Sequence, residues 1–222
     1  MGGFQMQMVA RGILVYEMTD DALITGLVGL GFAPSLLIVS LYGGVLGDRV
    51  ERRLLIQSSQ AANGGLAGVV AILMFTGNLA WGHLLTVSVL QGAMFALQMP
   101  ARQAAIPSLV GKDQLPNAFA LNAMAMSMMT LVAPALAGVL YEVTGPEWVY
   151  VIVCVVMLSA VIFTSLVPKM YPKVDTSKTS MIENIVAGFR YIGHNKLVLN
   201  LMIYGVIVAL LSMPFRMLVQ VY

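Results

Sequence analysis

The sequence predicts an all-α polytopic membrane protein, and its composition and the spacing of its apolar residues lead to that fold class. Of its 222 residues, 59% are hydrophobic and only 10% are charged, whereas soluble domains carry roughly 25% charged residues. The apolar residues gather in stretches of about 20, the length of helix that spans the hydrocarbon core of a bilayer. Because a soluble domain could not cover so much apolar surface, lipid must be the solvent for much of this chain.

Seven apolar segments are predicted as membrane helices. They cover residues 3–16, 22–42, 54–76, 80–99, 118–141, 148–167 and 198–221. The first segment is short and contains Gln5, Gln7 and Arg11. We therefore expect it to be the second half of a helix whose first half is missing.

Residues 168–197 form the one linker between these segments. Ser180 is a suitable N-cap with Glu183 three residues later, and apolar residues recur at helical spacing after it. This pattern predicts an amphipathic helix that lies on the membrane surface or against the base of the bundle. The chain then divides into an N-terminal transmembrane bundle over 1–167, this linker, and a seventh transmembrane helix over 198–222.

Basic residues outside the spans occur only on alternate loops. Those loops carry Arg49, Arg52, Arg53, Arg102, Lys112, Lys169, Lys173, Lys178, Arg190 and Lys196, and the intervening loops carry Glu17, Asp20, Asp21, Glu142 and Glu147. By the positive-inside rule the basic loops are cytoplasmic. We therefore expect a multi-pass protein of the plasma (inner) membrane, with loop 48–53 and linker 168–197 in the cytoplasm.

Residues 43–56 form a short charged turn between two membrane-length helices. Its glycines let the two helices end close together. Asp48 can cap a helix N-terminus or pair with an arginine. Arg52 and Arg53 can hold acidic partners or lipid headgroups. A simple positive-inside anchor without a moving part would also account for these charges.

The same turn resembles the G-x-L-x-D-R-x-G-R-R/K-x-x-L signature between helices 2 and 3 of major facilitator superfamily transporters. The matching residues are Gly44, Leu46, Asp48, Arg49, Arg52, Arg53 and Ile56, and Glu51 replaces the second glycine. The resemblance implies a conformational latch between two halves of a transporter. Its members here would be Gly44, Asp48, Arg49, Arg52 and Arg53, and their partner helix would belong to a second half that this chain lacks.

Two further stretches resemble the enterobactin-exporter group of that superfamily. Residues 100–107 (P-A-R-Q-A-A-I-P) and 115–122 (L-P-N-A-F-A-L-N) are similar to the segment after helix 4 of that group, and residues 14–19 (L-V-Y-E-M-T) are similar to the end of its helix 1. The resemblance implies twelve helices in two halves and alternating access around a mid-membrane site. It also implies outward transport of a small amphipathic molecule, such as a siderophore or a drug. The alternative is a truncated membrane fragment that transports nothing or serves as an interaction partner.

The fifth span contains A-P-A-L-A-G over residues 133–138, which resembles a degraded G-P-x-x-G-G antiporter motif. Pro134 removes a backbone hydrogen bond and bends the helix, and Gly138 allows close helix contact. An ordinary kinked packing helix accounts for the motif equally well. The superfamily's helix 4 arginine is replaced by Ser88, three residues before Gln91, which argues against proton coupling through that position.

Arg11 is a candidate functional residue because a charge inside the membrane is costly. Gln7 lies four residues before it and shares its helix face. Together with Gln91 and Asn122, these residues are the candidates for a substrate cavity. Snorkelling of Arg11 and interhelical hydrogen bonds of the amides are the alternatives.

The fifth span also carries a methionine cluster, for which we expect core packing, with an adaptable cavity wall as the alternative. Its members are Met124, Met126, Met128 and Met129.

No metal-ligand spacing, nucleophile constellation or phosphate-binding loop is recognisable, so the sequence predicts neither an enzyme nor a cofactor. The expected partners are a small-molecule substrate, the lipid bilayer and the missing second half of the transporter. Nucleic acid is not an expected partner. Cys154 is the only cysteine, so no disulfide can form within the chain.

Overall fold

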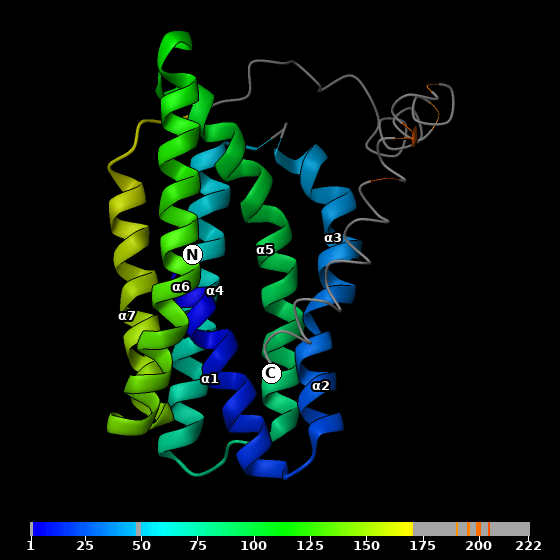
Figure 1. Ribbon diagram of the computed structural model, residues 1–222, viewed down its shortest axis with the longest axis vertical. Coiled ribbons are helices and arrows are strands. Elements are labelled where there is room, and N and C mark those ends of the chain that lie inside the picture. Colours follow the sequence, from blue (N-terminus) through cyan, green and yellow to red (C-terminus); the bar gives the residue numbers. More distant parts are fainter. Residues whose placement is uncertain are drawn as a thin grey trace. The chain divides into compact units, whose positions relative to one another are not determined.

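The computed structural model describes residues 2–47 and 50–170 and the isolated positions 190, 195, 199, 200 and 204. The chain separates into two compact units, residues 1–176 and 177–222. The first unit contains α1 (Gly2–Thr19), α2 (Ala22–Leu30), α3 (Phe32–Gly47), α4 (Arg52–Phe75), α5 (Trp81–Leu109), the 3₁₀ turn η1 (Lys112–Gln114), α6 (Leu115–Thr144) and α7 (Pro146–Ser165) (Figure 1). Apart from the isolated positions, the predicted amphipathic helix and seventh transmembrane helix lie outside the described residues.

Five helical segments of the described part are long and apolar enough to cross a membrane. They are Ala22–Tyr42, Arg52–Phe75, Trp81–Leu109, Lys112–Thr144 and Pro146–Ser165. They correspond to the second to sixth predicted spans, and α1 corresponds to the first. The described residues contain helices and no strands, so the prediction of an all-α membrane fold is confirmed.

Two predicted spans differ from the observed helices. The second is interrupted at Gly31, between α2 and α3, where Pro34 lacks the N–H that would bond to the carbonyl of Leu30. The fourth continues past Pro100 and Pro107 to the end of α5. Prolines are tolerated inside membrane helices because neighbouring groups satisfy the freed carbonyls, and Figure 1 shows the axis of α5 changing direction in its upper part.

Small residues determine which helices pack most closely. α4 has its most extensive contact with α7, and Gly64 and Gly68 make that approach possible. A Cβ atom at Gly64 would lie 3.2 Å from the Cβ atom of Met157, and one at Gly68 would lie 3.3 Å from the Sγ atom of Cys154. This spacing of two glycines four residues apart is typical of tightly packed membrane helices.

The contact between α3 and α5 depends on Gly92. A Cβ atom there would collide with the Oγ atom of Ser35 and with the backbone carbonyl of Phe32. Gly92 therefore lets the first turn of α3 lie directly on the middle of α5, which fixes the position of the broken second span.

The helices alternate between two ends of the bundle. The basic end holds the start of α4 and the ends of α5 and α7, with Arg52, Arg53, Arg102, Lys112 and Lys169. The acidic end holds the end of α1 and the turn between α6 and α7, with Glu17, Asp20, Asp21, Glu142 and Glu147. The sorting of basic residues predicted from the loops is thus found in the described bundle, and the acidic Glu51 and Asp113 also lie at the basic end.

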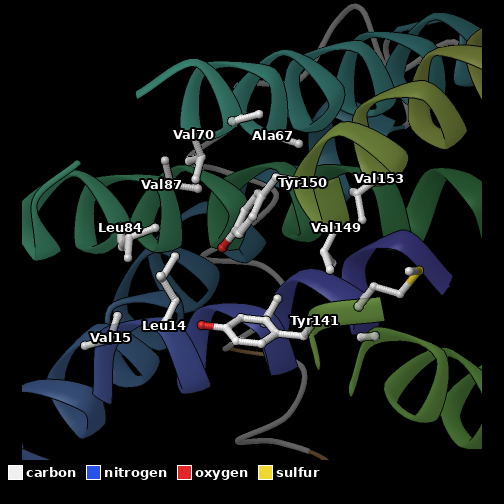
Figure 2. Packing of buried hydrophobic residues seen from close by; sticks show 14 of the residues in the cluster. Leu14, Val15, Ala67, Val70, Leu84, Val87, Tyr141, Val149, Tyr150 and Val153 are labelled. Carbon is white, nitrogen blue, oxygen red and sulfur yellow. The ribbon is translucent and has the colours of Figure 1, made fainter. Parts of the chain in front are cut away.

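An apolar core joins α1, α4, α5 and α7. Figure 2 shows Leu14, Val70, Leu84 and Val153 among the side chains that fill it. The ring of Tyr150 lies in the same cluster and is 1% exposed. This core brings one face of α1 against α5 and α7, which positions the polar residues described next.

Candidate functional site

A buried polar cluster links α1 to α5. The Arg11 guanidinium donates a hydrogen bond of 2.7 Å from Nη1 to the Oε1 atom of Gln91. The Nε2 atom of Gln91 in turn donates to the Oε1 atom of Gln7. Gln7 and Arg11 share one face of α1 because they are four residues apart, and all three side chains are buried. Three of the four predicted cavity residues are therefore in direct contact.

Tyr150 and Ser88 complete this cluster. Tyr150 packs in the same buried cluster as Leu14 and Leu84, which lie one turn from Arg11 on α1 and from Ser88 on α5. Ser88 lies one turn before Gln91 on the inward face of α5 and is fully buried. Sequence reasoning missed Tyr150, because a tyrosine near the start of an apolar helix more often marks the membrane interface.

Arg11 lies inside the six-span bundle and does not line an open wall. It is 4% exposed, so almost all of its side chain is buried. Among the described residues, no carboxylate pairs with it. The guanidinium is therefore a buried cation whose recorded hydrogen-bond partner is a neutral amide.

A separate pocket of about 130 Å³ opens at mid-height between α1, α5 and α6. Its lining consists of Phe4, Gln5, Phe95, Met99, Met126, Met129 and Thr130. Phe95 and Thr130 are each near the middle of a membrane-length helix, which places the pocket near the bilayer midplane. Aromatic rings, methionines and a polar pair make this lining suitable for an amphipathic ligand.

The aromatic part of this pocket is held by three helices. The ring centroid of Phe4 lies 5.4 Å from that of Phe32 and 5.2 Å from that of Phe95, and the Phe32 and Phe95 centroids are 5.6 Å apart. On the other side, Gln5 donates a 3.4 Å hydrogen bond to the Thr130 hydroxyl. These contacts join α1, α3, α5 and α6 around one site.

The methionine cluster lies largely on the surface of α6. Met124 is 69% and Met128 61% exposed, so the prediction of core packing was wrong for these two residues. Met126 and Met129 line the mid-height pocket. Exposed positions of a membrane helix can be as apolar as core positions, and the sequence pattern alone could not separate the two.

Asn122 is not part of the Arg11 cluster. It lines a cavity of about 410 Å³ at the basic end, between α4, α5, α6 and α7. Gln60, Arg102 and Thr164 line the same cavity, and the Thr164 hydroxyl donates a 3.1 Å hydrogen bond to the Oε1 atom of Gln60. The four predicted cavity residues therefore belong to two different places in the bundle.

The predicted latch segment is only partly described. Gly44 is in the last turn of α3, whereas Asp48 and Arg49 lie outside the described residues. Arg52 donates from Nη1 to the carbonyl oxygen of Ala104 at 2.8 Å and to the Ser108 hydroxyl at 2.9 Å. These acceptors are at the C-terminal end of α5, where the helix dipole favours a cation.

Arg53 makes the corresponding contact to α7. Its Nη1 atom donates a 2.8 Å hydrogen bond to the carbonyl oxygen of Val167, just beyond the end of that helix. The two arginines therefore join the start of α4 to the ends of α5 and α7 within one bundle. Sequence reasoning had considered acidic partners and lipid headgroups for them, and the observed acceptors are backbone carbonyls and one hydroxyl.

The motif over residues 133–138, in which Pro134 is predicted to bend the helix, lies in the second half of α6. Ala133 and Ala137 are buried, and Pro134 is inside the helix. A Cβ atom at Gly138 would meet no other atom within 4 Å, so the described contacts do not require glycine there. Within the described residues, no group of histidine, cysteine, aspartate and glutamate side chains has the arrangement of a metal site.

Most of this chain is similar to a known protein family and to curated relatives. A family model described as "Transmembrane secretion effector" matches residues 1–219. An enterobactin exporter of Shigella boydii is 26% identical over 212 residues, covering 92% of this chain and 49% of that protein. Macrolide efflux protein A of Streptococcus pyogenes is 26% identical over 212 residues, covering 91% of this chain and 50% of that protein. The chain spans about half the length of these curated relatives.

Proposed function

Because this chain belongs to the transmembrane secretion effector family of the major facilitator superfamily, we propose that it supplies one helical half of an exporter. The exporter moves a small amphipathic molecule outward across the plasma membrane. The observation that carries this proposal is the match of residues 1–219 to that family. The similarity to an enterobactin exporter and a macrolide efflux protein supports it.

The mid-height pocket is the proposed contact surface for the transported molecule. Phe4 and Phe95 offer ring faces, and Met99 and Met129 offer polarisable side chains that adapt to different shapes. Gln5 and Thr130 are the polar groups that orient an amphipathic ligand in this mainly apolar lining. Transporters of this architecture hold their substrate near the midplane, which agrees with the position of these residues along their helices.

Transport proceeds by alternating access, in which two helical halves rock about the site. The turn over residues 43–56 acts as the latch toward the second half, and Asp48 and Arg49 are two of its members. Arg52 and Arg53 support this role from within the bundle, because they hold the end of α5 and the segment after α7 against the start of α4. The basic end is cytoplasmic, in agreement with the positive-inside rule.

The experiment is an efflux assay on cells that express the natural gene, with a panel of siderophores and drugs. Phe95→Ala is expected to change which compounds are exported. Phe163→Ala is the matched control, because Phe163 is 70% exposed on α7 and the same ring is removed far from the pocket. Expression of residues 1–222 alone tests the alternative of a fragment that transports nothing. Unchanged accumulation of every compound relative to empty cells would overturn the proposal.

A further inference from the structure

The Arg11 guanidinium is a permanent positive charge in the apolar interior of the bundle. A charge at the centre of a membrane helix is strongly unfavourable, and burial without a counter-charge is favourable only when other groups compensate. The recorded acceptor is the Oε1 atom of Gln91. In the described part of the chain, the acidic side chains Glu17, Asp20 and Asp21 are at the acidic end, and Glu17 is hydrogen-bonded to Tyr141.

Three further buried donors on α1, α5 and α7 have no acceptor. They are the Nε2 atom of Gln7, the Oγ atom of Ser88 and the hydroxyl of Tyr150, which are buried and without a hydrogen-bond partner. Their side chains are 2%, 0% and 1% exposed, respectively. A buried polar group without a partner is uncommon and costs stability. Three such groups on the helices that carry or face an uncompensated cation indicate a missing acceptor.

Helix direction places these groups together. α1 runs toward the acidic end and α5 runs away from it, and the contact between Gln7 and Gln91 sets their register. One turn further toward the acidic end are Arg11 on α1 and Ser88 on α5. Tyr150 approaches from α7, and Figure 2 shows its hydroxyl directed away from α7, toward the side where Leu14 and Leu84 lie in that view.

We propose that Arg11, Tyr150, Ser88 and Gln7 bind one small monovalent anion inside this bundle. The anion neutralises the guanidinium and accepts hydrogen bonds from the two hydroxyls and the Gln7 amide. Water is a poorer occupant, because it carries no charge and brings two donors to a place that already has a surplus of donors. This site is separate from the mid-height pocket and does not depend on the proposed transport activity.

The enclosure of Arg11 favours an ion of chloride size. With 4% of its surface exposed, the side chain cannot be reached by a large organic molecule unless the helices separate. A free carboxylate such as acetate has the same charge and accepts the same hydrogen bonds. Both chloride and acetate are therefore small monovalent anions that fit the proposed site, and the experiment distinguishes between them.

The test measures the thermal unfolding midpoint of the purified full-length protein in detergent. Sodium chloride replaces sodium gluconate at constant ionic strength, and sodium acetate replaces it in a parallel series. We expect the midpoint to rise and saturate with chloride. The Arg11→Gln variant should lose this response, whereas Lys112→Gln should retain it, because Lys112 is an exposed residue of η1. A response to acetate as well would assign the site to small carboxylates in addition to chloride.

Tyr150→Phe keeps the ring and its packing but removes one donor. We expect the chloride concentration at half-saturation to rise by about tenfold, which corresponds to one hydrogen bond to a charged group. If Arg11→Gln does not fold, the half-saturation of Tyr150→Phe is sufficient to test the anion site. A wild-type unfolding midpoint that changes with neither chloride nor acetate would overturn the proposal. An Arg11→Gln variant with the full response, or a Tyr150→Phe variant with unchanged half-saturation, would also overturn it.

Discussion

The Tyr141 hydroxyl donates a 2.5 Å hydrogen bond to the Oε2 atom of Glu17, which joins α6 to α1 at the acidic end. Near the other end of α1, a Cβ atom at Gly2 would lie 3.1 Å from the Sδ atom of Met129. α1 therefore runs alongside the second half of α6. Because α6 also carries part of the mid-height pocket, this hydrogen bond helps to fix the distance across that pocket.

Removing either partner of this hydrogen bond should destabilise the α1–α6 contact. Tyr141→Phe keeps the ring but leaves Glu17 without this donor, and we expect a loss of about 1–2 kcal/mol. Glu17→Gln should have a smaller effect, since an amide oxygen can still accept. A double-mutant cycle of Tyr141→Phe with Glu17→Ala, which removes the acceptor, measures the coupling from unfolding in detergent. Strictly additive effects of the two substitutions would mean that the hydrogen bond contributes nothing.

Arg52 should be more important than Arg53 for the basic end, because it binds two acceptors on α5 whereas Arg53 binds one beyond α7. We expect Arg52→Ala to speed hydrogen exchange in the last two turns of α5, residues 104–109. Arg52→Lys should recover only part of the protection, because a point charge lacks the planar fork of a guanidinium.

Hydrogen–deuterium exchange with mass spectrometry checks this prediction peptide by peptide. Arg53→Ala is the matched control, since it removes the neighbouring arginine but none of the contacts to α5. Equal exchange of residues 104–109 in Arg52→Ala and the wild type would contradict the assignment of these hydrogen bonds.

The helices were predictable because bilayer thickness fixes their length, and apolar runs are visible in one sequence. The shared face of Gln7 and Arg11 was predictable from a spacing of four residues. The partner of Arg11 was among the predicted residues, but its pairing was not predictable. Gln91 is 80 residues away, and only the relative placement of α1 and α5 brings the two together.

The positions of Asn122 and of the methionines of α6 could not be predicted from the sequence. Asn122 has the same residue type as a cavity amide, yet its height along α6 places it in the basic-end cavity with Arg102. Met124 and Met128 face outward, and the few polar residues within α6 are not enough to show which side of the helix is covered. Height along a helix and rotation about its axis are therefore the two quantities that one sequence leaves open.

The sidedness of the bundle follows from its basic end and can be tested with single cysteines. In a Cys154→Ala background, Lys112→Cys and Asp20→Cys place thiols at exposed positions of the basic and acidic ends. In intact cells, we expect an impermeant thiol reagent to label position 20 and to leave position 112 unlabelled until the cells are opened. The reverse pattern would place the basic end outside.

Gly92 should be intolerant of even one added methyl group. In Gly92→Ala, the new Cβ atom would collide with the Ser35 hydroxyl and the Phe32 carbonyl. Backbone atoms cannot turn aside as a flexible side chain can, so α3 must shift away from α5. We expect a loss of stability of about 1–3 kcal/mol, the usual cost of overpacking.

Gly65→Ala is the matched control for this substitution. Gly65 is inside α4, and a Cβ atom there meets nothing within 4 Å. Alanine is a better helix former than glycine by up to about 1 kcal/mol, so this variant should be neutral or slightly more stable.

Because the start of α3 also carries Phe32 of the aromatic cluster, Gly92→Ala should alter the mid-height pocket, while Gly65→Ala should not. Thermal unfolding midpoints of both variants in detergent check the stability difference, and equal midpoints would show that α3 does not rest on Gly92.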